Sequence, residues 1–337
     1  MIINYRNKIA DSWSLIKSIT IVRLFNIILI KVSFLISYVF KKNFHSGMPV
    51  SISVEPTTSC NLQCKECPSG KRIFTRPTGK LNLELFNTII SQLGKNLTYL
   101  TLYFQGEPYL NPDFFTFVKE ARSKNIYVAT STNGHFLTKE NAVKTIESGL
   151  NRLIISVDGI DQHTYEQYRQ GGDLGKVTEG IKNLVMARNE KKYTIYIILQ
   201  FIVFAFNEHQ IDAIKKLAKE LGVDEVQIKT AQIYDYEKGN PLIPCDDKFS
   251  RYIKKDDGLY YLKKKTKNKC YRMWSSCVLS WDGLVVPCCF DKDAEFRMGD
   301  LKVESFKTIW TNNKYNDFRN QVLKNRNTNS ICNNCSE

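Results

Sequence analysis

From about residue 50 onward, short apolar runs rich in β-branched residues alternate with segments of helical periodicity, and this alternation constrains the fold of the 337-residue chain more than any other feature. The runs are nearly continuous, which is typical of strands buried on both faces of a parallel sheet. Strands that alternate with helices predict an α/β protein. We predict strands at 51–55, 98–104, 126–131, 152–157, 194–204 and 224–229, and helices at 82–93, 113–123, 138–148, 174–190 and 208–221.

Six strands are too few to close an eight-stranded barrel, so we expect an open, partial (β/α)6 TIM-like barrel. The predicted parts are an N-terminal amphipathic helical segment at 1–48, the barrel at 49–245 and a small cysteine-rich C-terminal domain at 246–337. Enzymes with parallel barrels carry their chemistry on the loops that follow the C-terminal ends of the strands. Functional residues are therefore expected on those loops.

Three cysteines directly follow the first predicted strand. Cys60, Cys64 and Cys67 stand within eight residues of one another, and thiolates are the soft ligands that iron–sulfur clusters require. Three thiolates can hold one cluster but leave its fourth iron without a protein ligand. A zinc site is the alternative, although zinc normally takes four ligands, often from CxxC pairs. The pattern predicts a cluster with one open iron.

The spacing of Cys60, Cys64 and Cys67 resembles the CxxxCxxC signature of the radical S-adenosylmethionine (radical SAM) superfamily, and the resemblance covers roughly residues 50–337. It implies a [4Fe-4S] cluster coordinated by these cysteines and by S-adenosylmethionine (SAM) at the open iron. In that family, reductive cleavage of SAM yields a 5′-deoxyadenosyl radical that abstracts hydrogen from a substrate. An electron donor such as flavodoxin or ferredoxin is the partner that this chemistry implies.

Glycines and polar residues follow the later strands, where the resemblance places contacts with SAM. Gly106-Glu107 matches the family's glycine–glutamate motif near the SAM amino group, although Gln105 stands where the family often has a first glycine. Arg169 resembles the arginine that meets the SAM carboxylate, a group that arginine binds bidentately. Taken singly, each residue has a turn or a surface position as its alternative. The predicted SAM contacts are Gly106, Glu107, Ser131, Asn133, Ser156, Asp158, Arg169 and Gln200.

The C-terminal region is similar to the SPASM and shorter twitch domains appended to many radical SAM barrels. Gly283 precedes Cys288 as in their motif, and a CxxC pair ends the cysteine series. The distal cysteine run of full SPASM domains is missing, so the resemblance implies a small iron–sulfur domain with a single auxiliary [4Fe-4S] cluster. Zinc on the same thiolates, and Cys277 in place of Cys270, are alternatives, and Cys289 is expected to be a buried thiol. The predicted ligands are Cys270, Cys288, Cys332 and Cys335.

Residues 16–40 are strongly apolar, but Arg23, Asn26 and Lys31 interrupt them. No uncharged run approaches the roughly 20 residues that span a bilayer. Three arrangements remain open: a helix or helical hairpin packed on the main domain, a helix lying on an anionic membrane surface, and a spanning helix. One apolar helical face is formed by Ile21, Phe25, Ile28, Val32, Leu35 and Val39.

The distribution of charge and the spacing of the cysteines indicate which binding partners and which cellular compartment to expect. Residues 1–48 and 251–269 together hold +12 of the net charge of +14. Nucleic-acid-binding proteins are expected to present a basic face with interleaved aromatics on the binding domain, so nucleic acid is not an expected partner. Ten cysteines at metal-ligand spacings, with no cleavable signal peptide, indicate a reducing compartment. We expect a cytoplasmic protein, with membrane association through residues 16–40 as the open alternative.

Three functions fit these features. One is a radical SAM enzyme for a small molecule, sugar or lipid-linked glycan, a second is a maturase of ribosomal peptides or proteins, and a third is a non-catalytic iron–sulfur electron carrier. Polar residues at successive strand ends favour an enzyme, because a carrier needs only the cysteines. Peptide modifiers often have an extra N-terminal peptide-binding domain, whereas the residues before 49 are apolar and helical. This difference favours the first function.

Overall fold

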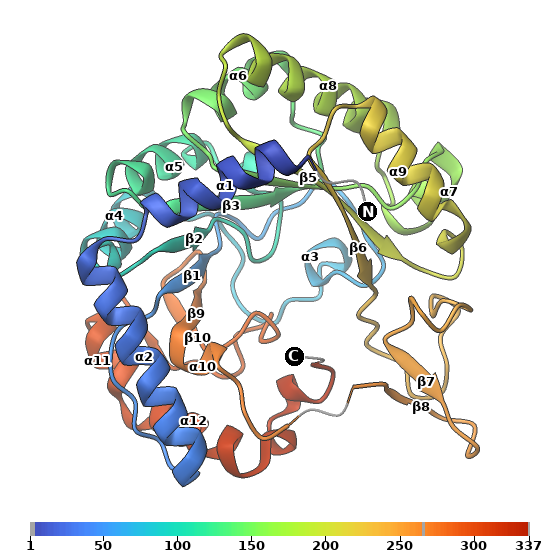
Figure 1. Cartoon of the computed structure of the whole chain (residues 1–337). Coiled ribbons are helices and arrows are strands. Elements are labelled where there is room, and N and C mark those ends of the chain that lie inside the picture. The colour runs from blue at the N-terminus through green and yellow to red at the C-terminus, as the bar shows by residue number, and fades with distance from the viewer. Residues whose placement is uncertain (1–3, 265–266, 336–337) are drawn as a thin grey trace.

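The structure, a computed structural model, describes residues 4–264 and 267–335 and contains a nine-stranded sheet curved into an open barrel (Figure 1). Residues 1–3, 265–266 and 336–337, which belong to the predicted N- and C-terminal segments, lie outside the described residues. The strand order is β11-β10-β9-β1-β2-β3-β4-β5-β6, and β1 to β6 run parallel to one another. The partial α/β barrel is thus confirmed.

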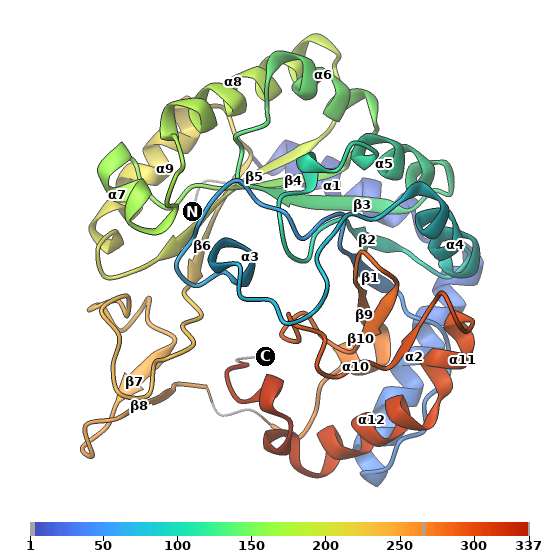
Figure 2. The same cartoon turned by 180° about the vertical axis from the view of Figure 1, so that it is seen from behind.

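Each predicted barrel strand and helix is present. Leu100 of β2 is paired with Val128 of β3, and both are fully buried, because helices cover the outer side of the sheet (Figure 2). The short helices α3 (Pro68–Lys71) and α7 (Gln162–Tyr168) were not predicted. The predicted elements are β1 (Ser51–Val54), α4 (Leu83–Leu93), β2 (Tyr99–Thr101), α5 (Phe114–Ser123), β3 (Tyr127–Thr132), α6 (Lys139–Glu147), β4 (Arg152–Ser156), α8 (Leu174–Glu190), β5 (Tyr196–Val203), α9 (Ile211–Glu220) and β6 (Glu225–Thr230).

The C-terminal region extends the barrel sheet with three strands. Strand β9 (Ser276–Leu279) lies parallel to β1, and β10 (Leu284–Val286) and β11 (Gly299–Asp300) follow antiparallel. At this junction the buried Glu55 carboxylate accepts two hydrogen bonds from Arg76 and one from the Trp281 N–H. Two further strands, β7 (Tyr252–Lys254) and β8 (Tyr260–Leu262), pair antiparallel in a small separate sheet. The helices of this region are α10 (Arg272–Ser275), α11 (Phe306–Thr311) and α12 (Asn313–Asn325).

The N-terminal helices α1 (Tyr5–Lys17) and α2 (Ile21–Phe40) pack on the barrel through their polar sides. The buried residues of α2 include Arg23, Asn26, Ser33 and Ser37, whereas the whole predicted apolar stripe from Ile21 to Val39 is exposed. The helix therefore packs on the main domain, as the first alternative expects, and it does so with its polar side, so its apolar stripe faces outward. By length and composition, α2 is the one helix among the described residues that can cross a membrane.

Arg23 fixes α2 to the barrel. Its guanidinium donates hydrogen bonds to the carbonyls of Ser18, Gly94, Lys124 and Asn125 at 2.5–2.9 Å. Four carbonyls from three parts of the chain therefore converge on one side chain. Their partial negative charges compensate the guanidinium, which is 2% exposed.

Arg23→Met is expected to lower the free energy of unfolding by about 2–4 kcal/mol, because buried carbonyls lose charged donors. Urea unfolding of the anaerobically purified protein measures this loss. Lys31→Met is the matched control, since Lys31 is an exposed cation on the same helix. Equal losses in both variants would contradict this account of Arg23.

Candidate functional site

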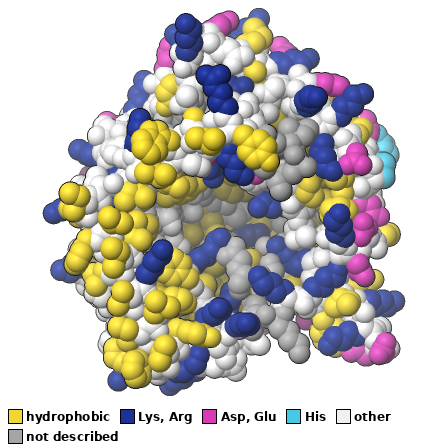
Figure 3. All heavy atoms as spheres, viewed as in Figure 1, with side chains coloured by type: hydrophobic (Ala, Val, Ile, Leu, Met, Phe, Trp, Pro, Cys, Tyr) yellow, Lys and Arg dark blue, Asp and Glu magenta, His cyan; other side chains and the backbone are white. Residues whose placement is uncertain are grey.

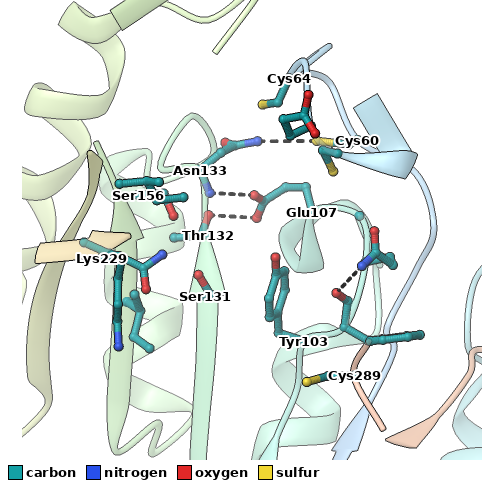
Figure 4. Close-up of a pocket in the computed structure, with 18 of the residues that line it drawn as sticks. Cys60, Cys64, Tyr103, Glu107, Ser131, Thr132, Asn133, Ser156, Lys229 and Cys289 are labelled. Atoms are coloured by element: carbon teal, nitrogen blue, oxygen red, sulfur yellow. Dashed lines mark hydrogen bonds between the residues drawn. The ribbon is translucent and has the colours of Figure 1, made fainter. Parts of the chain in front are cut away.

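A cavity of about 460 Å³ lies inside the barrel, lined by residues at the ends of the strands and by the loops that follow them. Cys60 and Cys64 lie at one end of it, and Tyr103 and Cys289 lie at the other (Figure 4). One end of the cavity is therefore formed by the loop after β1, and the other end is formed by the loop after β2 together with the C-terminal region. Most of the predicted strand-end residues meet in this cavity.

Cys60, Cys64 and Cys67 all line the cavity from a single loop. Burial raises the pKa of the Cys60 thiol to about 12 and also raises the pKa of Cys64. The Asn133 side-chain amide approaches Cys60 Sγ at 3.8 Å. Thiols with raised pKa values in a water-poor loop lose their protons when they bind metal, because the metal charge stabilises the thiolate. The chemistry of this donor set fits an iron–sulfur cluster.

Glu107 fastens the loops after β2 and β3 to each other. Its carboxylate accepts hydrogen bonds from the Thr132 hydroxyl at 2.7 Å, the Asn133 N–H at 2.8 Å and the Tyr109 N–H at 3.3 Å. Burial raises its pKa to about 7, and the hydrogen bond from the Asn133 N–H opposes this shift. Both oxygens are thus engaged by the chain itself, so Glu107 orders the cavity wall.

Gly106 is required where the loop after β2 meets the loop after β1. Its φ of +72° lies in the left-handed region, and an added Cβ would stand 2.2 Å from the Thr57 carbonyl oxygen and 2.8 Å from that of Ser59. The backbone N–H of Glu107, the next residue, donates a hydrogen bond to the Ser59 carbonyl at 2.8 Å. Only glycine permits this approach, which sets the position of the chain directly before Cys60.

Arg169 lines the cavity and is held by Asp158. Its Nε donates to Asp158 Oδ2 at 2.6 Å, while Oδ1 accepts the Ile202 N–H at 2.7 Å. Asp158 is fully buried behind Arg169 and does not line the cavity. Asp158 therefore positions the guanidinium, whose remaining nitrogens are available to an anion.

Seven of the eight predicted SAM contacts line the cavity, namely Gly106, Glu107, Ser131, Asn133, Ser156, Arg169 and Gln200. The structure adds Tyr103, Lys229, Lys292 and Cys289, which were not predicted. Tyr103 and Lys229 lie at or beyond the ends of β2 and β6, so the strand-end rule could have found them. Cys289, expected to be a buried thiol, is partly exposed and lines this cavity instead.

The four predicted auxiliary cysteines lie near one another in the C-terminal region. The pKa of Cys270 is raised by burial and also by the nearby Cys335. The pKa of Cys288 is raised by its hydrogen bond with Cys289, by burial and, to a smaller extent, by Cys270. The buried Arg326 donates to Cys335 Sγ at 2.8 Å, and it also lowers the pKa of Cys332 against the larger effect of burial.

Cys277, the alternative to Cys270, lies elsewhere. It is buried in β9, and the groups that act on its pKa besides burial are Arg319 and Tyr315. The surroundings of these thiols therefore favour Cys270 over Cys277 as a member of the group.

Comparison with known proteins decides the family. The model of the radical SAM superfamily matches residues 54–218, and that of SPASM, an iron–sulfur cluster-binding domain, matches residues 270–336. The chain belongs to the radical SAM superfamily. Its cofactors are accordingly a [4Fe-4S] cluster and SAM, and its SPASM domain binds auxiliary iron–sulfur.

Known members of the radical SAM superfamily resemble most of this chain. It is 27% identical over 297 residues to the tungsten-containing aldehyde ferredoxin oxidoreductase cofactor-modifying protein of Pyrococcus furiosus, covering 79% of this chain and 82% of that protein. SuiB of Streptococcus suis bound to SAM superposes with a TM-score of 0.61 at 12% identity, covering 81% of this chain and 68% of SuiB. BtrN in complex with AdoMet and 2-DOIA superposes with a TM-score of 0.53 at 18% identity, covering 87% of this chain and 94% of BtrN.

The SPASM model describes an iron–sulfur cluster-binding domain, which favours iron–sulfur over zinc on the C-terminal thiolates. Among the described residues, no three Cys, His, Asp or Glu side chains are arranged to bind one metal ion. A tetrahedral zinc with bonds of about 2.3 Å draws its sulfurs to about 3.8 Å from one another. Ligands of a four-iron cluster bind separate irons and stand farther apart than that.

Gly106→Ala is expected to lower both the iron content and the unfolding midpoint of the protein, because its Cβ would push the chain beside Cys60. Gly258→Ala is the matched control: Gly258 also has a positive φ, of +80°, but no atom lies within 4 Å of its added Cβ. Iron assay and denaturation of anaerobically reconstituted protein compare the two. If Gly258→Ala lost as much iron, the close approach at Gly106 would not be the cause.

Proposed function

We propose that this radical SAM enzyme abstracts a hydrogen atom from a small hydroxylated substrate, a sugar or a lipid-linked glycan, held in the barrel cavity. The observation that carries this proposal is the cavity itself, which runs from Cys60, Cys64 and Cys67 to Cys289 and is lined by hydrogen-bonding side chains. When bound, the cluster and SAM supply the reductive cleavage that gives a 5′-deoxyadenosyl radical. The chain supplies binding, orientation and exclusion of water.

The residues around the three cysteines suit SAM. Arg169, held by Asp158, would pair with the SAM carboxylate, and Ser131, Asn133, Ser156 and Gln200 would hydrogen-bond its polar groups. Glu107, whose carboxylate is engaged by the chain, would act by shaping the wall. Cys60, Cys64 and Cys67, which line the cavity, would hold the cluster.

The other walls suit a polar, anionic substrate. Lys229 and Lys292 bring two cations, and Thr101, Thr230 and Gln232 add neutral donors and acceptors. Lys292 lies 5.1 Å from the centre of the Tyr234 ring, which holds the ammonium at this side of the barrel. Hydroxyl and phosphate oxygens are the groups that such a set recognises.

The known relatives include proteins associated with small molecules and a protein associated with a peptide. One is named for modifying a cofactor and BtrN was crystallised with 2-DOIA, whereas SuiB was crystallised with its precursor peptide SuiA. A maturase function for this chain is therefore the second candidate. The cationic side chains of the cavity wall, Lys229 and Lys292, favour the first candidate.

The auxiliary thiols Cys270, Cys288, Cys332 and Cys335 would fully ligate a single cluster. A fully ligated cluster has no open iron that could bind substrate. We therefore assign this cluster a role in electron transfer or in stabilising the domain. A flavodoxin or ferredoxin in a reducing cytoplasm would supply the electron.

The test is release of 5′-deoxyadenosine from SAM by anaerobically reconstituted protein with dithionite. Wild type is expected to release it, and Cys64→Ala is expected to abolish release, because the cluster loses a ligand. Cys332→Ala should keep some SAM cleavage while losing product formation, since the radical cluster stays intact.

Cys245→Ala is the matched control, because Cys245 is an exposed cysteine remote in sequence from both ligand sets. It should leave the release unchanged. Absence of 5′-deoxyadenosine from wild type with both clusters loaded would reject the proposed function.

A further inference from the structure

The exposed apolar side chains of this protein are concentrated on the N-terminal helices. Fifteen of the twenty-four exposed large hydrophobic residues among those described lie between Tyr5 and Phe44. We call the outward surface of α1 and α2 the N-terminal apolar face, and its exposed members include Trp13, Ile16, Phe25, Ile28, Leu35 and Val39. A helix on a water-soluble domain normally turns its apolar stripe inward, so this orientation is reversed.

Specific polar contacts fix that reversed orientation. Asp11 of α1 accepts a hydrogen bond from the Tyr127 hydroxyl and forms an ion pair with Arg152. On α2, the Arg23 guanidinium binds four carbonyls, and the Asn26 side chain pairs with both backbone groups of Met48 at 2.8 and 2.9 Å. A helix about 30 Å long is thereby held lengthwise on the barrel. It cannot cross a bilayer without breaking these bonds.

Both helices lie on the same side of the molecule: in front in Figure 1 and behind in Figure 2. Figure 3 shows apolar side chains spread over this side, with Lys and Arg among them and a hollow at the centre. Contiguous exposed apolar surface of this kind marks a protein or a membrane interaction site.

Charge decides between these two occupants. Six cations on residues 4–44 are exposed, whereas Asp11, the one acidic residue there, is buried. A second copy docked by the same surface would bring like charges together. An anionic bilayer suits both the exposed cations and the exposed apolar side chains. Its headgroups attract the cations, and its acyl region accepts the apolar side chains. The exposed cations are Arg6, Lys8, Lys17, Lys31, Lys41 and Lys42.

We propose that the N-terminal apolar face docks on an anionic lipid bilayer, with α1 and α2 lying in the plane of its interface. The catalytic cavity lies close to this face. Tyr99 lines the cavity and stacks on Tyr127 with ring centres 5.0 Å apart, and Tyr127 in turn bonds Asp11 of α1. If the face docks in this way, the substrate is one carried by the membrane, and this narrower substrate class rests on the proposed function.

The test is co-sedimentation of anaerobically purified full-length protein with vesicles of phosphatidylcholine alone or mixed with phosphatidylglycerol. Wild type is expected to bind the mixed vesicles about tenfold more tightly than the neutral ones. The double variant Phe25→Glu/Leu35→Glu should lose about tenfold in affinity, because two charges enter the apolar face. Met186→Glu is the matched control, since Met186 is a 53% exposed hydrophobic residue on α8.

Release of 5′-deoxyadenosine without vesicles and light scattering are measured in parallel. Unchanged release in the double variant shows that it is folded, and absence of release from wild type would reject the proposed function while leaving the docking result standing. The docking proposal is overturned if wild type does not bind mixed vesicles, or if Met186→Glu weakens binding as much. A wild-type dimer that the double variant converts to monomers, without vesicle binding, would assign the face to a second copy.

Discussion

The carboxylate of Glu107 joins the loops that the active cavity depends on. The carboxylate accepts hydrogen bonds from Thr132 at the end of β3 and from Asn133 just after it, while the Glu107 backbone N–H donates to the Ser59 carbonyl beside Cys60. Gly106 permits this approach, because a side chain there would overlap the Thr57 carbonyl. Three successive strand ends are therefore tied at one point, and the cysteine loop takes its position from them.

Much of this architecture could be predicted from sequence because it follows from local patterns. Buried parallel strands are continuous apolar runs, and their C-terminal ends meet at one edge, so polar residues after successive strands predict a common site. The place of Asp158 behind Arg169 could not be predicted, since either residue can be the one that faces a ligand. Cys289 was missed for a similar reason: adjacent cysteines differ only in the direction that the folded loop gives them.

The N-terminal helices show the limit of periodicity. The stripe from Ile21 to Val39 predicts an amphipathic helix, and the helix is present. Periodicity does not say which face packs on the protein, because that depends on partners distant in sequence. Here Asn125, Gly94 and Met48 offer backbone groups that only polar side chains can satisfy, and they bind the polar face of α2. The apolar face is left outward.

The central claim is that Cys60, Cys64 and Cys67 hold a cluster whose open iron takes SAM. Electron paramagnetic resonance of the dithionite-reduced protein, with and without SAM, tests it most directly. We expect that SAM changes the cluster signal of wild type, that the change persists in Cys332→Ala, and that it disappears in Cys60→Ala. A wild-type spectrum that SAM leaves unchanged, or a SAM-induced change that survives in Cys60→Ala, would contradict it.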